Sequence, residues 1–227
     1  MLLWFASAFL LLAWEFPDTE LTDMAIDSRG IVWLLPVSDP AVIRIGLDGE
    51  YYRFETGNPG LSAGLAVSRA GRWLLSDGAG SVLRRYDADD LPIETIHVSN
   101  PGDVLFYGLS IWYIDTMRGN VMSSTGAVVA RDCGDRNSRL CAEPGGLGMI
   151  SGPRGVFLLQ EGETPEKIAE TGSACFSSRG ILILSAGVLR VFDGDTLETG
   201  LLNDRISASP DGEIVILWGG SSPQVFQ

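Results

Sequence analysis

The chain has little of what enzyme active sites are usually built from. It contains one histidine, His97, and three cysteines, Cys133, Cys141 and Cys175, among 227 residues. No phosphate-binding glycine loop and no His-Glu-x-x-His pair occurs in it. Histidine catalysis needs an orienting partner, so we interpret His97 as a locally hydrogen-bonded turn residue. We therefore expect no catalytic site and no metal centre, because a structural zinc site needs four Cys or His ligands.

Positive charge is also scarce. The 16 basic residues face 29 acidic ones, which gives a net charge of -13. Affinity for nucleic acid and for anionic lipid depends on Lys and Arg, so we expect neither as a partner.

Long apolar runs are absent too. The longest, Leu2–Ala13, is too short for a bilayer, which takes about 20 residues. Its length is typical of a signal peptide cleaved after Ala13, although Leu11 is larger than a cleavage site prefers. The alternative is an uncleaved hydrophobic strand or membrane-surface anchor. We expect residues 1–13 to direct export to the periplasm or the extracellular space, and residues 14–227 to form one domain without a membrane span.

The cysteine pattern fits an oxidising compartment. Cys133 and Cys141 bracket a polar stretch, CGDRNSRLC, which predicts a loop closed by a local disulfide. Cys175 stands alone in an apolar run and is expected to be a small buried residue.

One sequence motif, which we call the phrase, recurs along the chain: two apolar runs joined by a polar turn that carries glycine. Its six occurrences are Met24–Leu35, Leu65–Asp77, Val104–Asp115, Met149–Gln160, Cys175–Ala186 and Ile206–Trp218. The turn glycines are separated by 41, 37, 47, 25 and 32 residues, close to the period of a propeller blade. We predict an all-β fold, a six-bladed β-propeller of four-stranded blades, with five blades as the alternative.

Two blades deviate from this period. The short interval predicts a fourth blade without an outer strand, whose edge is residues 166–171. The last blade ends early, so we expect the N-terminal strand Trp14–Phe16 to complete it. Trp33, Trp73, Trp112 and Trp218 recur in the second strand of their blades and are expected to pack between blades.

The first unit, DMAIDSRGIVWLL followed by VIRIGLDGEYYRF, resembles the NHL and streptogramin-lyase type of six-bladed propeller. This resemblance implies the fold only, because the motifs are structural. Streptogramin lyases rely on histidine with a metal-held carboxylate, which a chain with one histidine cannot assemble in that form. Gluconolactonase-like propellers hold a divalent cation in the central channel, so Ca²⁺ is the only cofactor considered. Asp39, Asp77, Asp103 and Asp115 could approach that channel, but Asp in turns usually caps backbone N–H groups.

The function expected from these observations is a noncatalytic, exported binding or scaffold module, monomeric, with a protein as its expected partner. Its recognition surface would be the face that carries the loops between blades and between second and third strands. The expected binding residues are Asp39, Asp77, Asp115, Arg118, Arg136 and Trp218, with Arg118, Arg136 and Trp218 as anchors. Two alternatives remain open: a divalent-metal lactonase or lyase, and a subunit of a larger envelope complex.

Overall fold

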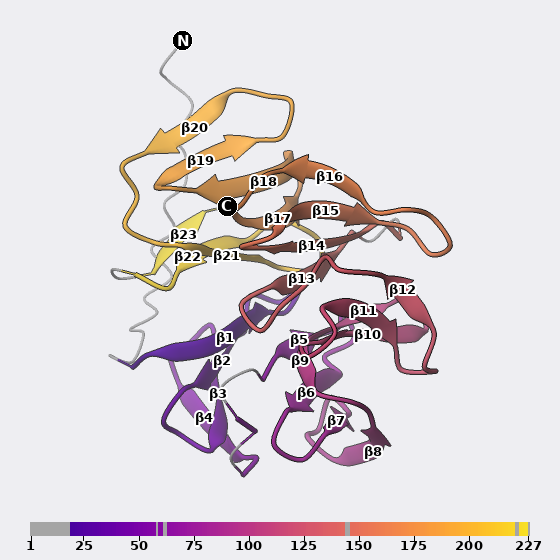
Figure 1. Cartoon of the computed structure of the whole chain (residues 1–227). Helices are drawn as coiled ribbons and strands as arrows, with labels where there is room; N and C mark the ends of the chain where they lie inside the picture. Colours follow the sequence, from indigo (N-terminus) through magenta and orange to yellow (C-terminus); the bar gives the residue numbers. More distant parts are fainter. Residues whose placement is uncertain (1–18, 58, 61–62, 144–145, 221–222, 227) are drawn as a thin grey trace.

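Six small sheets follow one another in a closed ring around a common axis (Figure 1). The computed structural model describes residues 19–57, 59–60, 63–143, 146–220 and 223–226, which form strands and turns with no helix. It follows that no helix in this part of the chain could cross a membrane. The first strand of each sheet lies beside the first strands of its two neighbours, and the last sheet returns to the first. The chain is thus a six-bladed β-propeller, as the repeat predicts, and the five-bladed alternative is wrong.

Each blade runs in chain order from its inner strand, at the channel, to its outer strand. The first three blades consist of β1 (Leu21–Ile26), β2 (Val32–Pro36), β3 (Ala41–Ile45), β4 (Tyr51–Glu55); β5 (Leu65–Val67), β6 (Trp73–Asp77), β7 (Val82–Tyr86), β8 (Pro92–His97); and β9 (Pro101–Tyr107), β10 (Ser110–Asp115), β11 (Asn120–Ser123), β12 (Val128–Ala130). The last three consist of β13 (Arg139–Ala142), β14 (Gly148–Gly152), β15 (Gly155–Leu159), β16 (Glu166–Ala169); β17 (Ser173–Ser177), β18 (Gly180–Ser185), β19 (Val188–Val191), β20 (Thr196–Thr199); and β21 (Arg205–Ala208), β22 (Val215–Trp218), β23 (Gln224–Phe226).

The antiparallel pairing of neighbouring strands gives the propeller two different faces. All inner strands start at one face, which we call the loop face because it carries the connections between blades and between second and third strands. They end at the opposite face, which we call the turn face because it carries the tight turns between first and second strands. A residue's position in its strand therefore fixes the face to which it is closest.

The fourth blade differs from its prediction. The phrase Met149–Gln160 covers β14 and β15, which are the second and third strands, whereas in the other blades the phrase covers the first two. The inner strand β13 begins inside the stretch interpreted as a loop between Cys133 and Cys141. Its turn to β14 carries Gly146, whose N–H donates to the Glu143 carbonyl over 3.0 Å. With Gly146 as the turn glycine, the spacings of 47 and 25 residues become 38 and 34. The blade has its outer strand, β16, so the prediction of a missing strand was wrong.

The last blade has three described strands, and β23 is the third, as expected. Trp14–Phe16, which was expected to complete this blade, lies outside the described residues, as does the expected signal peptide, residues 1–13. Within the described chain, the ring closes through a hydrogen bond from Ser207 Oγ on β21 to the carbonyl of Met24 on β1, 3.1 Å long.

Tryptophans fill the spaces between blades, as the sequence predicts. Trp33, Trp73 and Trp112 are at most 1% exposed, and the rings of Trp33 and Trp73, from neighbouring blades, lie 5.6 Å apart. Trp73 also stacks on Tyr86 with ring centroids 3.8 Å apart. Large flat side chains suit these positions because two twisted sheets can pack against opposite faces of one ring.

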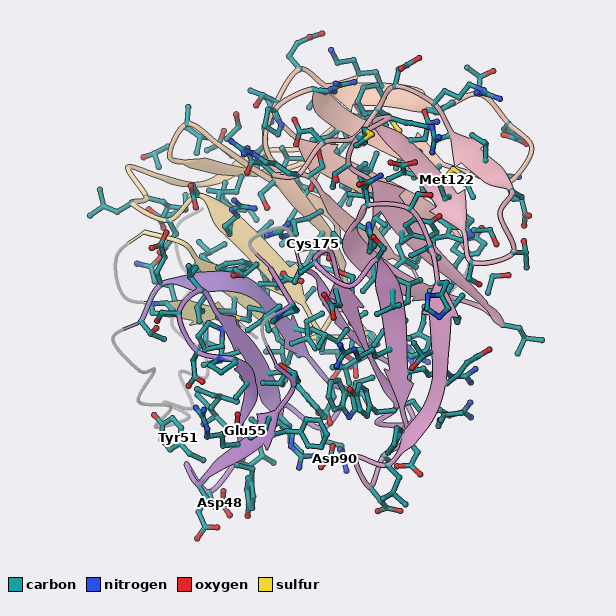
Figure 2. The ribbon with its side chains drawn as sticks, turned by 60° about the horizontal axis from the view of Figure 1, so that its bottom comes forward. Asp48, Tyr51, Glu55, Asp90, Met122 and Cys175 are labelled. Atoms are coloured by element: carbon teal, nitrogen blue, oxygen red, sulfur yellow. The ribbon has the colours of Figure 1, made fainter. Side chains whose placement is uncertain are left out.

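The expected Cys133–Cys141 disulfide is wrong, because both residues are free thiols. Cys133 packs with Leu140 in the core between blades 3 and 4, whereas Cys141 packs near Ala174 in the core between blades 4 and 5. Successive residues of a strand point to opposite faces, so β13 separates the two sulfur atoms. Cys175 is buried, as expected, and Figure 2 shows it in the interior, away from the peripheral residues Asp48, Tyr51 and Glu55.

Candidate functional site

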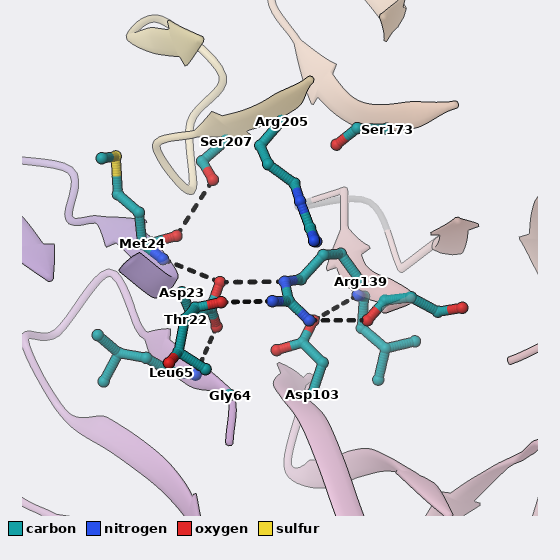
Figure 3. Close-up of polar contacts among 12 residues, drawn as sticks. Thr22, Asp23, Met24, Gly64, Leu65, Asp103, Arg139, Ser173, Arg205 and Ser207 are labelled. Atoms are coloured by element: carbon teal, nitrogen blue, oxygen red, sulfur yellow. Dashed lines mark hydrogen bonds and ion pairs between the residues drawn. The ribbon is translucent and has the colours of Figure 1, made fainter. Parts of the chain in front are cut away.

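One position recurs where the chain enters each of the six inner strands from the loop face. It immediately precedes the apolar residue that opens the inner-strand pattern: Met24, Leu65, Val104, Leu140, Ala174 and Ile206. Its occupants are Asp23, Gly64, Asp103, Arg139, Ser173 and Arg205, and we call these six residues the channel ring (Figure 3). The ring brings two carboxylates and two guanidinium groups, far apart in the sequence, to one end of the channel.

Side chains of the ring join alternate blades to their next neighbours. Three of them each accept a hydrogen bond from the opening N–H of the following inner strand: Asp23 Oδ2 from Leu65 over 2.7 Å, Asp103 Oδ2 from Leu140 over 2.6 Å and Ser173 Oγ from Ile206 over 3.1 Å. Serines elsewhere join the remaining blades: Ser76 to the Gly102 carbonyl, Ser151 to the Ala174 N–H and Ser207 to the Met24 carbonyl. An inner strand has one edge without a partner strand, so its buried backbone groups need such side chains.

Arg139 crosses the channel from the fourth blade to the first. Its Nε lies 3.3 Å from Asp23 Oδ1, and its two terminal nitrogens donate to the carbonyls of Thr22 and Ser138 (Figure 3). The Arg139 and Asp23 side chains are only 13% and 5% exposed. This buried ion pair therefore braces the loop-face end of the channel.

Gly64 occupies its ring position because the second and third blades approach closely there. A Cβ on Gly64 would lie 2.5 Å from the Asp103 Cα and 2.9 Å from the Val104 nitrogen. Both contacts are with backbone, which cannot rotate away as a side chain can. The site therefore requires glycine for its lack of a side chain.

Burial controls the charge state of the ring. It raises the pKa of Asp103 well above its ordinary value, and the neighbouring Asp23 carboxylate raises it further, against the opposing effect of Arg139. Burial also lowers the pKa of Arg205, followed by repulsion from Arg139. Arginine stays protonated at such a shift, so Arg205 keeps its positive charge, whereas the neutral form of the Asp103 carboxyl group is more favoured than in water.

A cavity of about 400 Å³ occupies the channel between the ring and the turn face. Its lining includes Asp23, Asp103 and Arg139 at one end and the turn residues Arg69 and Glu143 at the other. The lining between them contains five alanines, Ala25, Ala66, Ala142, Ala174 and Ala208, together with larger apolar residues. A volume of this size falls in the range of small-molecule sites.

The expected binding residues do not line this cavity. Asp39 pairs with Arg53, and Asp77 pairs with Arg84 at 2.6 Å while accepting the Gly80 N–H at 2.7 Å. Asp115 likewise accepts from turn N–H groups and pairs with Arg118 at 2.8 Å. Asp77 and Asp115 therefore cap turns at the loop face, as Asp in turns usually does, whereas Asp39 is held by its ion pair with Arg53.

The expected anchors occupy different environments. Trp218 is 2% exposed, and its indole N–H donates to Ser207 Oγ over 2.9 Å, so it serves the core and is not available at the surface. Arg118 is 64% exposed at the loop face. Arg136 is exposed and borders a shallow hollow on the same face, which we call the loop-face hollow. It is lined by Asn100, Thr116, Met117, Asp135, Arg136 and Asn137.

The channel does not fit a Ca²⁺ site. Of the four aspartates considered for it, Asp103 lies there and the other three do not line the cavity. Calcium takes six to eight oxygen ligands, whereas here the Arg139 guanidinium lies beside the ring carboxylates and backbone N–H groups engage them. Among the described residues, no group of three His, Cys, Asp or Glu side chains is placed to hold a metal ion.

Sequence reasoning missed Asp23, Arg139 and Arg205 as channel residues. The signal that could have found them is their common place directly before the opening residue of each inner strand. In the fourth blade this signal was missed, because the repeated pattern Met149–Gln160 was assigned to the first two strands and in fact covers the second and third. The sequence also holds a Gly-x-Ser-x-Gly pattern, Gly60–Gly64, before β5. A nucleophile elbow lies between a strand and a helix, and the element that follows this pattern among the described residues is the strand β5.

Comparison with known proteins places the fold among six-bladed propellers of known structure. No protein-family model matches the sequence, and the search of curated proteins found no match. Virginiamycin B lyase from Staphylococcus aureus is similar in structure, with a TM-score of 0.63, 13% identity and coverage of 92% of this chain and 84% of that one. A gluconolactonase from Xanthomonas campestris is similar with a TM-score of 0.65 and 14% identity, and the match covers 91% of this chain and 85% of that one. A chain of the nidogen–laminin complex is similar with a TM-score of 0.63 and 14% identity, and the match covers 82% of this chain and 81% of that one.

These similarities confirm the architectural resemblance to streptogramin-lyase and NHL-type propellers. The identities are too low to carry an activity from any of these proteins to this chain. What the fold and the comparisons establish together is a six-bladed β-propeller whose neighbours include a lyase, a lactonase and a chain of a protein complex.

Proposed function

We propose that this chain is a noncatalytic binding module that recognises a protein partner through the loop-face hollow. The observation that carries the proposal is the composition of this surface. Met117 is 77% exposed at the hollow, Arg136 borders it and the exposed Arg118 follows Met117 in the chain. Arginine is over-represented in interface hot spots, and methionine adapts to varied partner surfaces.

The state of the channel supports a noncatalytic role. A general acid or base needs a carboxyl group or imidazole within reach of a substrate. Asp23 and Asp103 line the cavity, but each already accepts a backbone N–H of the neighbouring blade, and Asp23 also pairs with Arg139. His97 is exposed at the end of β8, an outer strand. The nidogen–laminin complex offers an example of a similar fold in a protein assembly.

Export belongs to the same proposal. The apolar segment Leu2–Ala13 supports a periplasmic or extracellular location, with the mature chain starting at Trp14. Terminal sequencing of the protein purified from its native source tests this directly. A chain that retains Met1 in the cytoplasm would contradict export without affecting the binding proposal.

Site-specific crosslinking tests the binding proposal. A photoreactive amino acid replaces Met117 at the hollow, and in a separate variant replaces Leu109, which is fully exposed in the turn of the same blade. We expect a discrete crosslinked species from position 117, lost when Arg136 is changed to Glu, and none from position 109. Equal crosslinking at both positions, or none at 117, would contradict the proposal.

The lactonase or lyase alternative is tested separately by calorimetry with Ca²⁺ and by turnover of lactone substrates. We expect no saturable heat and no turnover, because the channel ring lacks the oxygen ligands of a calcium site. Turnover that disappears on Asp103→Asn would instead establish the enzyme.

A further inference from the structure

Arg205 extends from the start of β21 across the loop-face end of the channel, and no buried carboxylate in the described part of the chain pairs with it directly. Its side chain is 26% exposed, and one terminal nitrogen donates to the Asn137 carbonyl, in the loop leading to the fourth blade, over 3.3 Å. The guanidinium carbon lies 5.8 Å from the Trp218 ring centroid. Among the described residues, the carboxylate within 4.0 Å is that of Asp204, at 3.8 Å from Nε, and it is 71% exposed. A guanidinium has five N–H donors, so this one retains unused capacity.

A second guanidinium adds to the positive potential at this point. Figure 3 shows the Arg205 side chain directed toward Arg139, without a dashed line between Arg205 and either ring carboxylate. Arg139 is committed to Asp23 and to two carbonyls. Two like charges held together in a partly buried site disfavour each other, and an anion bound to Arg205 would offset that repulsion.

Two polar side chains near the start of β21 retain hydrogen-bonding capacity. Ser173 Oγ accepts the Ile206 N–H, which leaves its hydroxyl hydrogen free for an acceptor. Asn203, two residues before Arg205, is 3% exposed, and neither its side-chain nitrogen nor its oxygen has a hydrogen-bond partner. A buried amide with both atoms unsatisfied is rare in proteins and requires an explanation such as a missing ligand or water.

We infer that the loop-face end of the channel binds a carboxylate group between Arg205 and Ser173. The planar fork of a guanidinium matches the two oxygens of a carboxylate, and the serine hydroxyl supplies a further donor. A single negative charge suits the site better than a phosphate dianion, because Asp23 and Asp103 lie in the same ring. The net charge of -13 does not prevent this, since charges beyond about 8 Å are screened at physiological ionic strength. The inference goes beyond the proposed function and does not depend on the loop-face hollow.

Titration of the whole protein with defined anions tests the site. Acetate and succinate are the probes in one arm, and a short peptide with one glutamate and an amidated C terminus is the probe in the other. Binding is followed by calorimetry and by the ¹⁵Nε resonance of Arg205. Saturable binding in the first arm indicates a free small carboxylate, and saturable binding only in the second indicates a partner's acidic side chain. Both outcomes support the site.

Variants make the test specific. Arg205→Gln should weaken binding about 10- to 100-fold, because it removes a charge-assisted hydrogen-bond pair, and Arg205→Lys should weaken it less. Arg190→Gln, an exposed arginine of the neighbouring blade, should bind as the wild type does. If Arg205→Gln proves poorly folded, protection of Arg205 from butanedione by succinate in the wild-type protein gives the same information. No response beyond that of chloride at equal ionic strength, or equal binding by Arg205→Gln, would overturn the inference.

Discussion

Replacing Arg139 by leucine should lower the free energy of unfolding by more than the lost packing contacts alone would account for. The leucine keeps much of the apolar stem but removes the charge 3.3 Å from Asp23, a residue that is 3% exposed. Breaking a buried ion pair from one side costs about 3–5 kcal/mol, because it leaves an uncompensated charge. For a domain of this size, each kcal/mol lowers Tm by about 2–4 °C, so a fall of roughly 6–20 °C is expected.

The double variant Arg139→Leu, Asp23→Asn separates the charge effect from other losses. The asparagine removes the stranded charge while its oxygen can still accept the Leu65 N–H, so we expect it to restore about half of the lost stability. The free energy of unfolding is measured by urea titration. Arg190→Leu on exposed β19 is the control and should change stability by at most about 0.5 kcal/mol. A loss below about 1 kcal/mol for Arg139→Leu, or no rescue by Asp23→Asn, would refute the idea that this ion pair braces the channel.

Three further predictions concern the channel and the thiols. Gly64→Ala should lower the free energy of unfolding in urea by about 1–3 kcal/mol or more, because the new methyl group meets the Asp103 backbone. The control Gly162→Ala has open space around it and should cost only its positive-φ strain of about 1 kcal/mol. Equal losses in the two variants would disprove the close approach. Asp103→Asn should stabilise the protein at neutral pH, and the gain should shrink as the pH falls toward 3.8. The sign follows from the raised pKa: the folded state favours the protonated acid, so its ionisation as pH rises costs stability, and a gain that grows at low pH would contradict this. Cys133 and Cys141 should resist alkylation at pH 8 until the protein is unfolded, since burial raises their pKa values to about 11 and about 12. A disulfide between them, found by mass spectrometry of the native protein, would contradict the structure.

The repeat was the part of the fold that the sequence could reveal. Strand pairs joined by a glycine turn recur because each blade solves the same packing problem, so the pattern survives in local sequence. The tryptophans Trp33, Trp73 and Trp112 could be assigned to the core for the same reason, since each occupies an equivalent strand position. The fourth blade was misread because β14 and β15 also form an apolar pair around a glycine turn, and local pattern does not distinguish one hairpin of a blade from the next.

The site was less accessible to sequence reasoning. Asp103 was considered for the channel, but Asp77 and Asp115 were considered equally, and nothing local separates an aspartate that caps a turn from one that reaches the next blade. Arg139 was hidden within a segment that was interpreted as a loop. The disulfide failed because eight residues of sequence separation say nothing about which side of a strand each sulfur occupies.

The sequence by itself determined the blade repeat, the all-β class, the net negative charge and the positions of the buried tryptophans, because these properties depend on composition and on periodicity within one blade. Only the tertiary structure decided the rest. Asp23, Gly64, Asp103, Arg139, Ser173 and Arg205 are spread over more than 180 residues, and they meet because the inner strands of six blades enter the channel from the same face. A contact made by closing a ring depends on all the blades at once, so no segment of the chain carries it alone.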